Sequence, residues 1–451
     1  LSWEKAAYLP DIQTEFGPGS YGYRDDLTDY AKATGGFIER EYNGKTYRSL
    51  GETNDYWGPR YDGSEVLYWD GKTRAYNSLG NPWSDIFRTG FNQNYNVAIT
   101  NSTDRNNLRF SYTYSDVKAM QYNSNNHRHN FNLNGTFDVF PTVKLNYSAM
   151  FQSQYIKNRP YRISRLVTNF TGMVGSYEDL AYYRTHTVTA AGYRNRVYNS
   201  SSHENPDEGW EYSPGVPSLI SEYYWNILGR EQYENNQRFI GSVSPSWQII
   251  PGLTLKGSIA TDWTGQDVEL KDHQETASVF SGYGGYYGLT KRRYQTIYGD
   301  ALVNYNKEWG KFGLDVNLGY SARKETTLNS SVGTNGGLTV ENWFHLNASA
   351  GKANASETTS ALLKQAVFGT IDLSYSNFLF VEGTIRNEKT STLAAGNNSF
   401  WYPSVNGSLI YSELIPNRPS WYDYGKFRVS YGVVGLAPEV HNICITERQG
   451  K

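Results

Sequence analysis

Two groups of side chains have types and spacings that could support chemistry. His127 and His129 lie two residues apart, so on an extended strand they would face the same side, as a pair of metal ligands could. Asp207, Glu208 and Glu211 could hold Ca²⁺ or supply the two carboxylates of a glycosidase. The histidines lack a third ligand nearby, and acidic loop residues are usually solvated. We therefore expect no metal or cofactor site, with a structural Ca²⁺ in the loops as the alternative.

Other motifs argue against an enzyme. The run Gly282–Gly288 has neither the Lys-Ser/Thr pair nor the strand-to-helix setting of a phosphate loop. It is better interpreted as a mobile aromatic loop, with ligand stacking as the alternative. The chain contains no Ser–His–Asp, Cys–His or HExxH constellation. Its single cysteine, Cys444, excludes an intrachain disulfide framework.

Aromatic residues are the strongest binding candidates. They make up 16% of the chain, with 39 Tyr and 12 Trp, and such side chains suit surfaces where one edge is apolar and the other is wet. The alternative is that they pack loops against one another. A short helix is expected over 219–228. The candidates for contact with a substrate or a lid protein are Trp57, Tyr61, Trp69, Trp210, Tyr223, Tyr224 and Trp225.

The elements that must position these residues are β-strands. Tight connections at Pro141, Pro251-Gly252, Gly310 and Asn377 alternate with much longer ones. Short turns at one end and long loops at the other are typical of an outer-membrane barrel, with turns in the periplasm and loops outside the cell. The twelve predicted strands cover 91–100, 105–115, 129–140, 142–155, 236–249, 253–263, 294–309, 311–323, 365–376, 378–388, 401–412 and 424–434.

The faces of these strands support a membrane barrel. In 312–321, Phe312, Leu314, Val316 and Leu318 share one face, whereas the opposite face is polar. Charged residues avoid the apolar face, because a Lys or Arg facing lipid at the bilayer midplane costs roughly 2–4 kcal/mol. A soluble antiparallel sheet with one solvated face shows the same alternation, so a soluble carbohydrate-binding or adhesin domain is the second hypothesis.

Net charge argues against a nucleic-acid partner, and the order of the predicted elements divides the chain into three regions. A net charge of −2 gives no basic footprint for nucleic acid. Residues 1–90 lack sustained periodicity and are predicted to be a long loop region. Residues 91–434 are predicted to form the transmembrane barrel segment, and 435–451 an irregular tail.

Ordered motifs across nearly the whole chain resemble the SusC/RagA family of TonB-dependent transporters. The first part of the resemblance lies in Trp57–Gly63, Asn81–Trp83, Phe87–Gly90 and Asn94–Ile99. It continues through Leu108–Asp116, His129–Asn134, Asn236–Ser242, Pro251–Leu255 and Phe427–Gly432.

The resemblance implies a 22-strand barrel, of which the twelve strands would be a middle portion. It implies import of glycans or peptides through the outer membrane of a Bacteroidota-type Gram-negative bacterium. The implied partners are a SusD-like surface lipoprotein and TonB-ExbB-ExbD, acting through a plug and TonB box that we do not find in this chain. Departures after Gly435, including Leu436 where the family usually has Asn, weaken the match there. A passive porin is a further alternative.

Overall fold

A computed structural model describes most of the chain. The described residues are 1–9, 11–18, 37–42, 44–50, 56–68, 71–161, 174–189, 191–194, 216–416, 419 and 421–440. Trp69, Trp210, the acidic group Asp207, Glu208 and Glu211, and Cys444 lie outside them.

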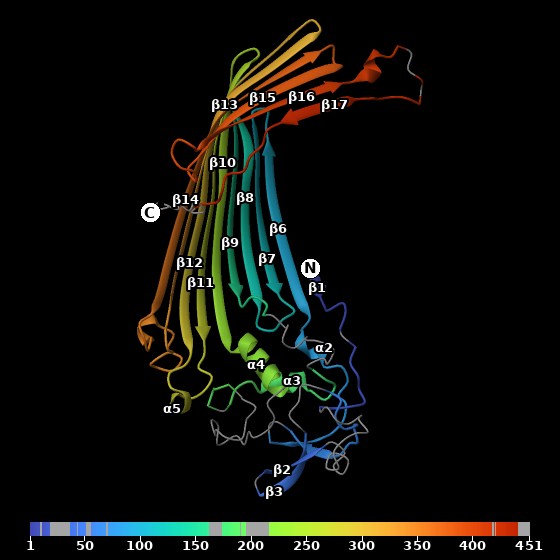
Figure 1. The fold of residues 1–451 in the computed structure, drawn as a ribbon, viewed down its shortest axis with the longest axis vertical. Helices are drawn as coiled ribbons and strands as arrows, with labels where there is room; N and C mark the ends of the chain where they lie inside the picture. The colour runs from blue at the N-terminus through green and yellow to red at the C-terminus, as the bar shows by residue number, and fades with distance from the viewer. Residues whose placement is uncertain are drawn as a thin grey trace, which may run out of the picture.

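One antiparallel sheet of 13 strands dominates the structure (Figure 1). The short strand β1 (Ser2–Glu4) forms one edge, and β6 to β17 follow in sequence order, each hydrogen-bonded to the next. These twelve strands confirm the predicted number. Their bounds are β6 Gly90–Ser102, β7 Asn106–Lys118, β8 Asn125–Phe140, β9 Val143–Lys157, β10 Arg230–Ile250, β11 Leu253–Asp272, β12 Tyr286–Trp309, β13 Phe312–Gly333, β14 Asn354–Tyr375, β15 Leu379–Thr390, β16 Ser399–Leu409 and β17 Phe427–Gly432.

The two ends of the sheet differ, as the sequence predicts. At the turn end, only 103–105, 141–142, 251–252, 310–311 and 376–378 separate paired strands. Ser376 and Asn377 both have positive φ, 48° and 60°, as the two central residues of a type I′ turn require. The loop end carries 119–124, 158–229, 273–285, 334–353 and 391–398. The exception is 410–426, a longer connection at the turn end that contains the 3₁₀ helix η2 (Tyr411–Leu414).

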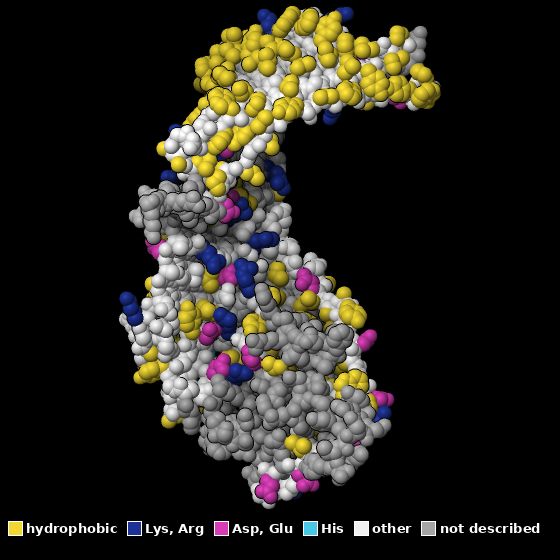
Figure 2. Space-filling model, in the orientation of Figure 1, with side chains coloured by type: hydrophobic (Ala, Val, Ile, Leu, Met, Phe, Trp, Pro, Cys, Tyr) yellow, Lys and Arg dark blue, Asp and Glu magenta, His cyan; other side chains and the backbone are white. Residues whose placement is uncertain are grey.

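The register aligns apolar residues into continuous rows on one face of the sheet, here called the apolar face. One such row across eight strands is Val143, Trp247, Leu255, Val303, Leu318, Gly369, Ile385 and Pro403. No second layer covers it among the described residues, since Ile259 is 71% exposed and Leu318 is 63% exposed. Figure 2 shows hydrophobic side chains gathered over the turn end, whereas charged side chains lie further down the strands.

The strands extend beyond this apolar band. In β13 the band covers Phe312–Tyr320, close to the roughly 9–11 residues that cross a bilayer. The strand then continues to Gly333, with Lys324 on the same face. Most predicted strands, such as 311–323, stop short of the loop end, because apolar alternation stops where the band stops while the hydrogen-bonded ladder continues. The predicted strand 424–434 instead runs beyond both ends of β17.

Smaller elements gather at the loop end of β6–β10 (Figure 1). A second sheet contains β2 (Ile38–Tyr42), β3 (Lys45–Ser49), β4 (Glu65–Leu67) and β5 (Thr73–Ala75), within the region predicted as a long loop. The short helices are α2 (Trp83–Ile86), α3 (Leu180–Thr185) and α5 (Ser278–Ser281). Helix α4 (Val216–Leu228) confirms the helix expected over 219–228. Among the described residues, no helix has the length and apolar character needed to cross a membrane.

Candidate functional site

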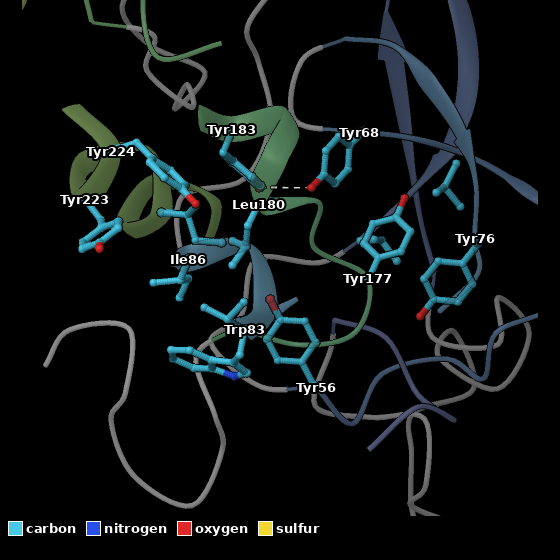
Figure 3. Packing of buried hydrophobic residues seen from close by; sticks show 14 of the residues in the cluster. Tyr56, Tyr68, Tyr76, Trp83, Ile86, Tyr177, Leu180, Tyr183, Tyr223 and Tyr224 are labelled. Carbon is cyan, nitrogen blue, oxygen red and sulfur yellow. Dashed lines mark hydrogen bonds between the residues drawn. The ribbon is translucent and has the colours of Figure 1, made fainter. Parts of the chain in front are cut away.

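The loop end contains a hydrophobic core of its own, here called the loop core (Figure 3). It forms from two segments that are distant in sequence, 37–86 and 174–227. The small elements and loops of these segments bury their apolar side chains against one another. The members of the loop core are Phe37, Leu50, Tyr56, Val66, Tyr68, Tyr76, Trp83, Ile86, Val174, Tyr177, Leu180, Tyr183, Ile220, Tyr223, Tyr224 and Ile227.

A buried carboxylate joins the two segments. Glu178, which is 1% exposed, accepts hydrogen bonds from the hydroxyls of Tyr56 (3.0 Å), Tyr68 (2.7 Å) and Tyr183 (2.8 Å). Burial raises the pKa of Glu178 above its usual range, although the three tyrosine donors oppose that shift. Arg74 lies over the Tyr68 ring at 4.1 Å and also acts against the shift. Burial, together with the Glu178 charge, raises the pKa of each of the three tyrosines, which therefore stay protonated as donors.

The structure places Tyr61 beside the loop core. Its hydroxyl lies 2.9 Å from that of Ser176, and its ring contacts Tyr76 at 4.9 Å between centroids. Burial raises the pKa of Tyr61 to about 12. Trp57 differs, because 40% of its surface is exposed while its ring contacts Phe16. Of these two candidates, Trp57 thus has the more exposed side chain.

The candidates on α4 are buried. The Tyr223 hydroxyl accepts a 3.0 Å hydrogen bond from Gln121 in the β7–β8 loop. Tyr224 is fully buried, and its hydroxyl has no hydrogen-bond partner among the described residues. Trp225 is also buried. In this arrangement the three side chains pack loops together. Contact with a substrate or lid protein stays a prediction for these three residues and for Trp57, Tyr61, Trp69 and Trp210.

The loop core is fastened to the strand ends by polar contacts. The Asn123 side-chain amide donates to the carbonyl of Ile227 at 3.0 Å, and the His273 ring lies 2.6 Å from the carbonyl of Gly229. Arg159 forms a two-bond pair with Glu234 on β10, with both distances 2.6 Å. The first two contacts hold the C-terminal end of α4 against neighbouring strand ends, and the Arg159–Glu234 pair ties the chain just after β9 to β10.

The polar face of the sheet has two regions of different chemistry. On β6 to β9 it consists mostly of amides and hydroxyls, whereas on β11 to β15 it carries Asp262, Asp315, Asp372, Glu382 and Arg386. The amide-rich region includes Asn92, Asn94, Asn96, Ser111, Thr113, Ser115, Asn126, Asn130, Asn132, Asn134, Asn146, Ser148, Gln152 and Gln154. A cavity of about 350 Å³ lies in the charged region, lined in part by Asp315, Asp372 and Glu382.

Metal ligation finds no support in the described parts of the chain. No three His, Cys, Asp or Glu side chains gather there as metal ligands would. His127 lies 3.0 Å from the Asp116 carboxylate, and the His129 ring lies 2.8 Å from the Tyr112 hydroxyl. Both histidines are therefore engaged with neighbouring-strand side chains. The structural Ca²⁺ considered for Asp207, Glu208 and Glu211 stays a prediction, because those residues are not described.

Sequence reasoning missed the loop core and Glu178. Glu178 stands in the ordinary run Ser176-Tyr177-Glu178-Asp179, and its three donors lie up to 122 residues away. Only the abundance of tyrosine gave a signal, and it could not indicate which tyrosines meet.

Comparisons with known proteins identify the fold. No family model and no curated protein matches the chain. Among solved structures, the RagAB peptide transporter matches with a TM-score of 0.62 and 15% identity over 82% of this chain. The open-open state of the RagAB peptide importer matches with a TM-score of 0.63 and 14% identity over the same share.

The chain has the fold of a RagA-like TonB-dependent transporter barrel. It spans 39% of the length of each of those RagAB chains. The RagA-like fold confirms the predicted class, an all-β antiparallel barrel segment. The full complement of 22 strands stays a prediction.

Proposed function

We propose that this chain forms part of an outer-membrane, TonB-dependent importer of the SusC type in a Bacteroidota-type bacterium. The importer takes up glycans or peptides with a SusD-like lipoprotein as its lid. TonB-ExbB-ExbD would act through a plug and TonB box contributed by further parts of the protein. The RagA-like fold supports the transport class, and the similarity to the RagAB peptide transporter supports a polymeric or oligomeric substrate.

The exposed apolar band carries the membrane part of the proposal. Large side chains such as Ile259, Leu318 and Val367 are exposed in aligned rows. Contiguous apolar patches beyond a few hundred Å² are rare on soluble monomers. A hydrocarbon environment satisfies this face without a second protein layer. Lys307 is a charged residue on this apolar face. It lies close to the turn end, where its long side chain can reach the headgroups.

The strand lengths and the positions of their charged residues also agree with an apolar band embedded in the membrane. Beyond the band, strands such as β12 place Lys291 and Arg293 on the face that carries apolar residues nearer the turns. Charges there fit water or headgroups rather than hydrocarbon. The loop core would then stand above the membrane at the extracellular mouth, where a lid lipoprotein and substrate arrive.

If the chain were a soluble domain, the apolar rows would be buried rather than exposed. A carbohydrate-binding or adhesin sandwich would cover the rows containing Leu318 and Ile385 with a second sheet, as packed sheets do. Those rows are instead exposed among the described residues. A passive porin shares the barrel, and it differs in having no TonB box.

The proposal is tested with the full-length protein in its native host. We expect it in the outer-membrane fraction, insoluble without detergent, and co-purifying with a surface lipoprotein. Deletion should abolish growth on one class of glycan or peptide while leaving growth on monosaccharides and amino acids unchanged. A detergent-free monodisperse monomer would refute the membrane assignment, and unimpaired growth on every oligomeric nutrient would refute the import role.

A further inference from the structure

Two neighbouring loops at the loop end form one fixed unit. The Glu341 carboxylate accepts hydrogen bonds from Ser278, at 2.9 Å from its backbone nitrogen and 2.6 Å from its hydroxyl. Tyr193 donates to the other carboxylate oxygen at 2.5 Å. The backbone N–H of Leu338 donates to the carbonyl of Gly284 at 2.8 Å. Loop 334–353 is thus held against loop 273–285, which contains most of the tyrosine–glycine run singled out from sequence.

Phe344 anchors the tip of loop 334–353. Its ring meets His273 edge-on at 4.9 Å and lies 6.5 Å from Tyr287. Asn342, two positions before Phe344, accepts a 2.9 Å hydrogen bond from the backbone N–H of Gln274. Fixing residues 342 and 344 also fixes the backbone of Trp343 between them.

Trp343 and His345 form a stacked pair at this anchored tip. Their ring centroids are 5.3 Å apart and their planes differ by 10°. The His345 ring accepts a 3.1 Å hydrogen bond from the backbone N–H of Asn347, which sets its orientation. Trp343 remains 50% exposed. The imidazole therefore stacks beside the indole, and half of the Trp343 surface is exposed to solvent on a pre-organised backbone.

We propose that Trp343, backed by His345, is a stacking subsite for a pyranose ring of a glycan substrate. This inference rests on the proposed import function and narrows its substrate class. A pyranose presents a flat C–H face that packs on an aromatic ring, and a rim of hydroxyls that binds polar groups. Burying an apolar sugar face on a ring that is already oriented costs little ordering entropy.

Two observations favour a glycan over a peptide at this subsite. The nearest acidic group, Glu341, is already bound by Ser278 and Tyr193, so it has few lone pairs left for a peptide amine. Half of the Trp343 surface is also exposed, and an indole offers a flat uncharged surface to the C–H face of a sugar.

Native affinity electrophoresis of the detergent-solubilised full-length protein tests the subsite. The gels contain amylopectin, xylan, galactan or mucin, each at a series of concentrations. We expect at least one of them to retard the wild type, and Trp343→Ala to weaken retention about tenfold, the scale of one aromatic contact. Trp343→Phe should keep most of the retention, because it keeps a flat ring.

A matched control is Trp421→Ala. Trp421 is 82% exposed beside another ring, Tyr422, but it lies in the connection at the turn end. It should migrate as the wild type does. Heat-modifiable mobility in SDS verifies that each variant is folded, and Trp343→Leu supplies a second variant that keeps apolar bulk without a π-face.

Two results would overturn the subsite. They are retardation by none of the four glycans, or retardation unchanged by Trp343→Ala and Trp343→Leu. Each leaves the import role intact if the wild type still inserts and supports growth. Failure of the wild type to reach the outer membrane instead defeats the proposed function itself.

Discussion

The Tyr68 hydroxyl donates a 2.7 Å hydrogen bond to Glu178 across 110 residues of sequence, inside the loop core. This contact connects the short β2–β5 sheet region to the segment that carries α3. It explains how two long stretches without sustained periodicity form one packed unit above the strands. The loop end is therefore a built structure rather than a set of independent loops.

Removing this donor should loosen the loop core. Tyr68→Phe deletes one hydrogen bond to a buried carboxylate and should lower stability by about 1.5–3 kcal/mol, the range for bonds to charged groups. Limited proteolysis of the detergent-solubilised protein would show faster cleavage between the strands, with the barrel fragment intact. Tyr8→Phe, at an exposed position, is the control. Equal cleavage of both variants would mean that Glu178 does not fasten the two segments.

The loop core should be more stable in mild acid. Burial raises the folded-state pKa of Glu178, so the folded protein binds its proton more tightly than the unfolded chain does. This contribution to stability is fully present below the usual glutamate pKa of about 4.3. It is lost as pH rises through the raised pKa of Glu178. Protease resistance measured against pH should therefore fall with rising pH in the wild type. Glu178→Gln cannot titrate and should flatten this component; an unchanged profile would show that another group is responsible.

The close packing around Gly175 gives a steric prediction. A Cβ at this position would lie 2.0 Å from Cδ1 of Tyr56, so the Tyr56 ring and its bond to Glu178 would have to move. Gly175→Ala should destabilise the loop core by about 1–3 kcal/mol, the usual cost of overpacking. Gly407→Ala, where a Cβ meets nothing within 4 Å, is the matched control. Thermal unfolding that does not distinguish the two variants would contradict the packing described here.

Much of the sheet could be predicted from sequence, for a physical reason. The turn-end boundaries, such as Ile250/Leu253 and Trp309/Phe312, fall where apolar alternation is strongest and turn residues are specific. The loop-end boundaries were missed, because beyond the apolar band both faces are polar and a strand leaves no period in the sequence. In β12, for example, the strand begins at Tyr286, eight positions before the predicted start at 294.

The binding candidates were harder to predict than the strands. Abundant tyrosine correctly drew attention to the loops, but burial depends on contacts between 37–86 and 174–227 that no local pattern encodes. Tyr223 and Tyr224 are core residues, whereas Trp57 is 40% exposed and Trp343, which was not among the candidates, is 50% exposed. Exposure of an aromatic side chain is a tertiary property, so sequence alone could not separate the two groups.

The two faces of β16 should respond differently to charge. Val405 lies on the apolar face and Asn406 on the polar face, where its amide donates to Glu382 at 3.2 Å. Val405→Lys should cost about 2–4 kcal/mol and reduce the folded, heat-modifiable form in the outer membrane. Asn406→Lys places the cation beside Glu382 and should assemble normally. Normal assembly of both variants would indicate that Val405 does not face lipid.

Site-directed spin labelling tests the membrane assignment most directly. Single cysteines at positions 318 and 317, in a Cys444→Ser background, place nitroxides on opposite faces of β13 in the reconstituted full-length protein. Oxygen concentrates in hydrocarbon, whereas a neutral nickel chelate stays in water. We predict that the label at 318 collides more with oxygen and the label at 317 more with nickel. Strong nickel accessibility at 318, or equal accessibility at both positions, would contradict a lipid-facing apolar band.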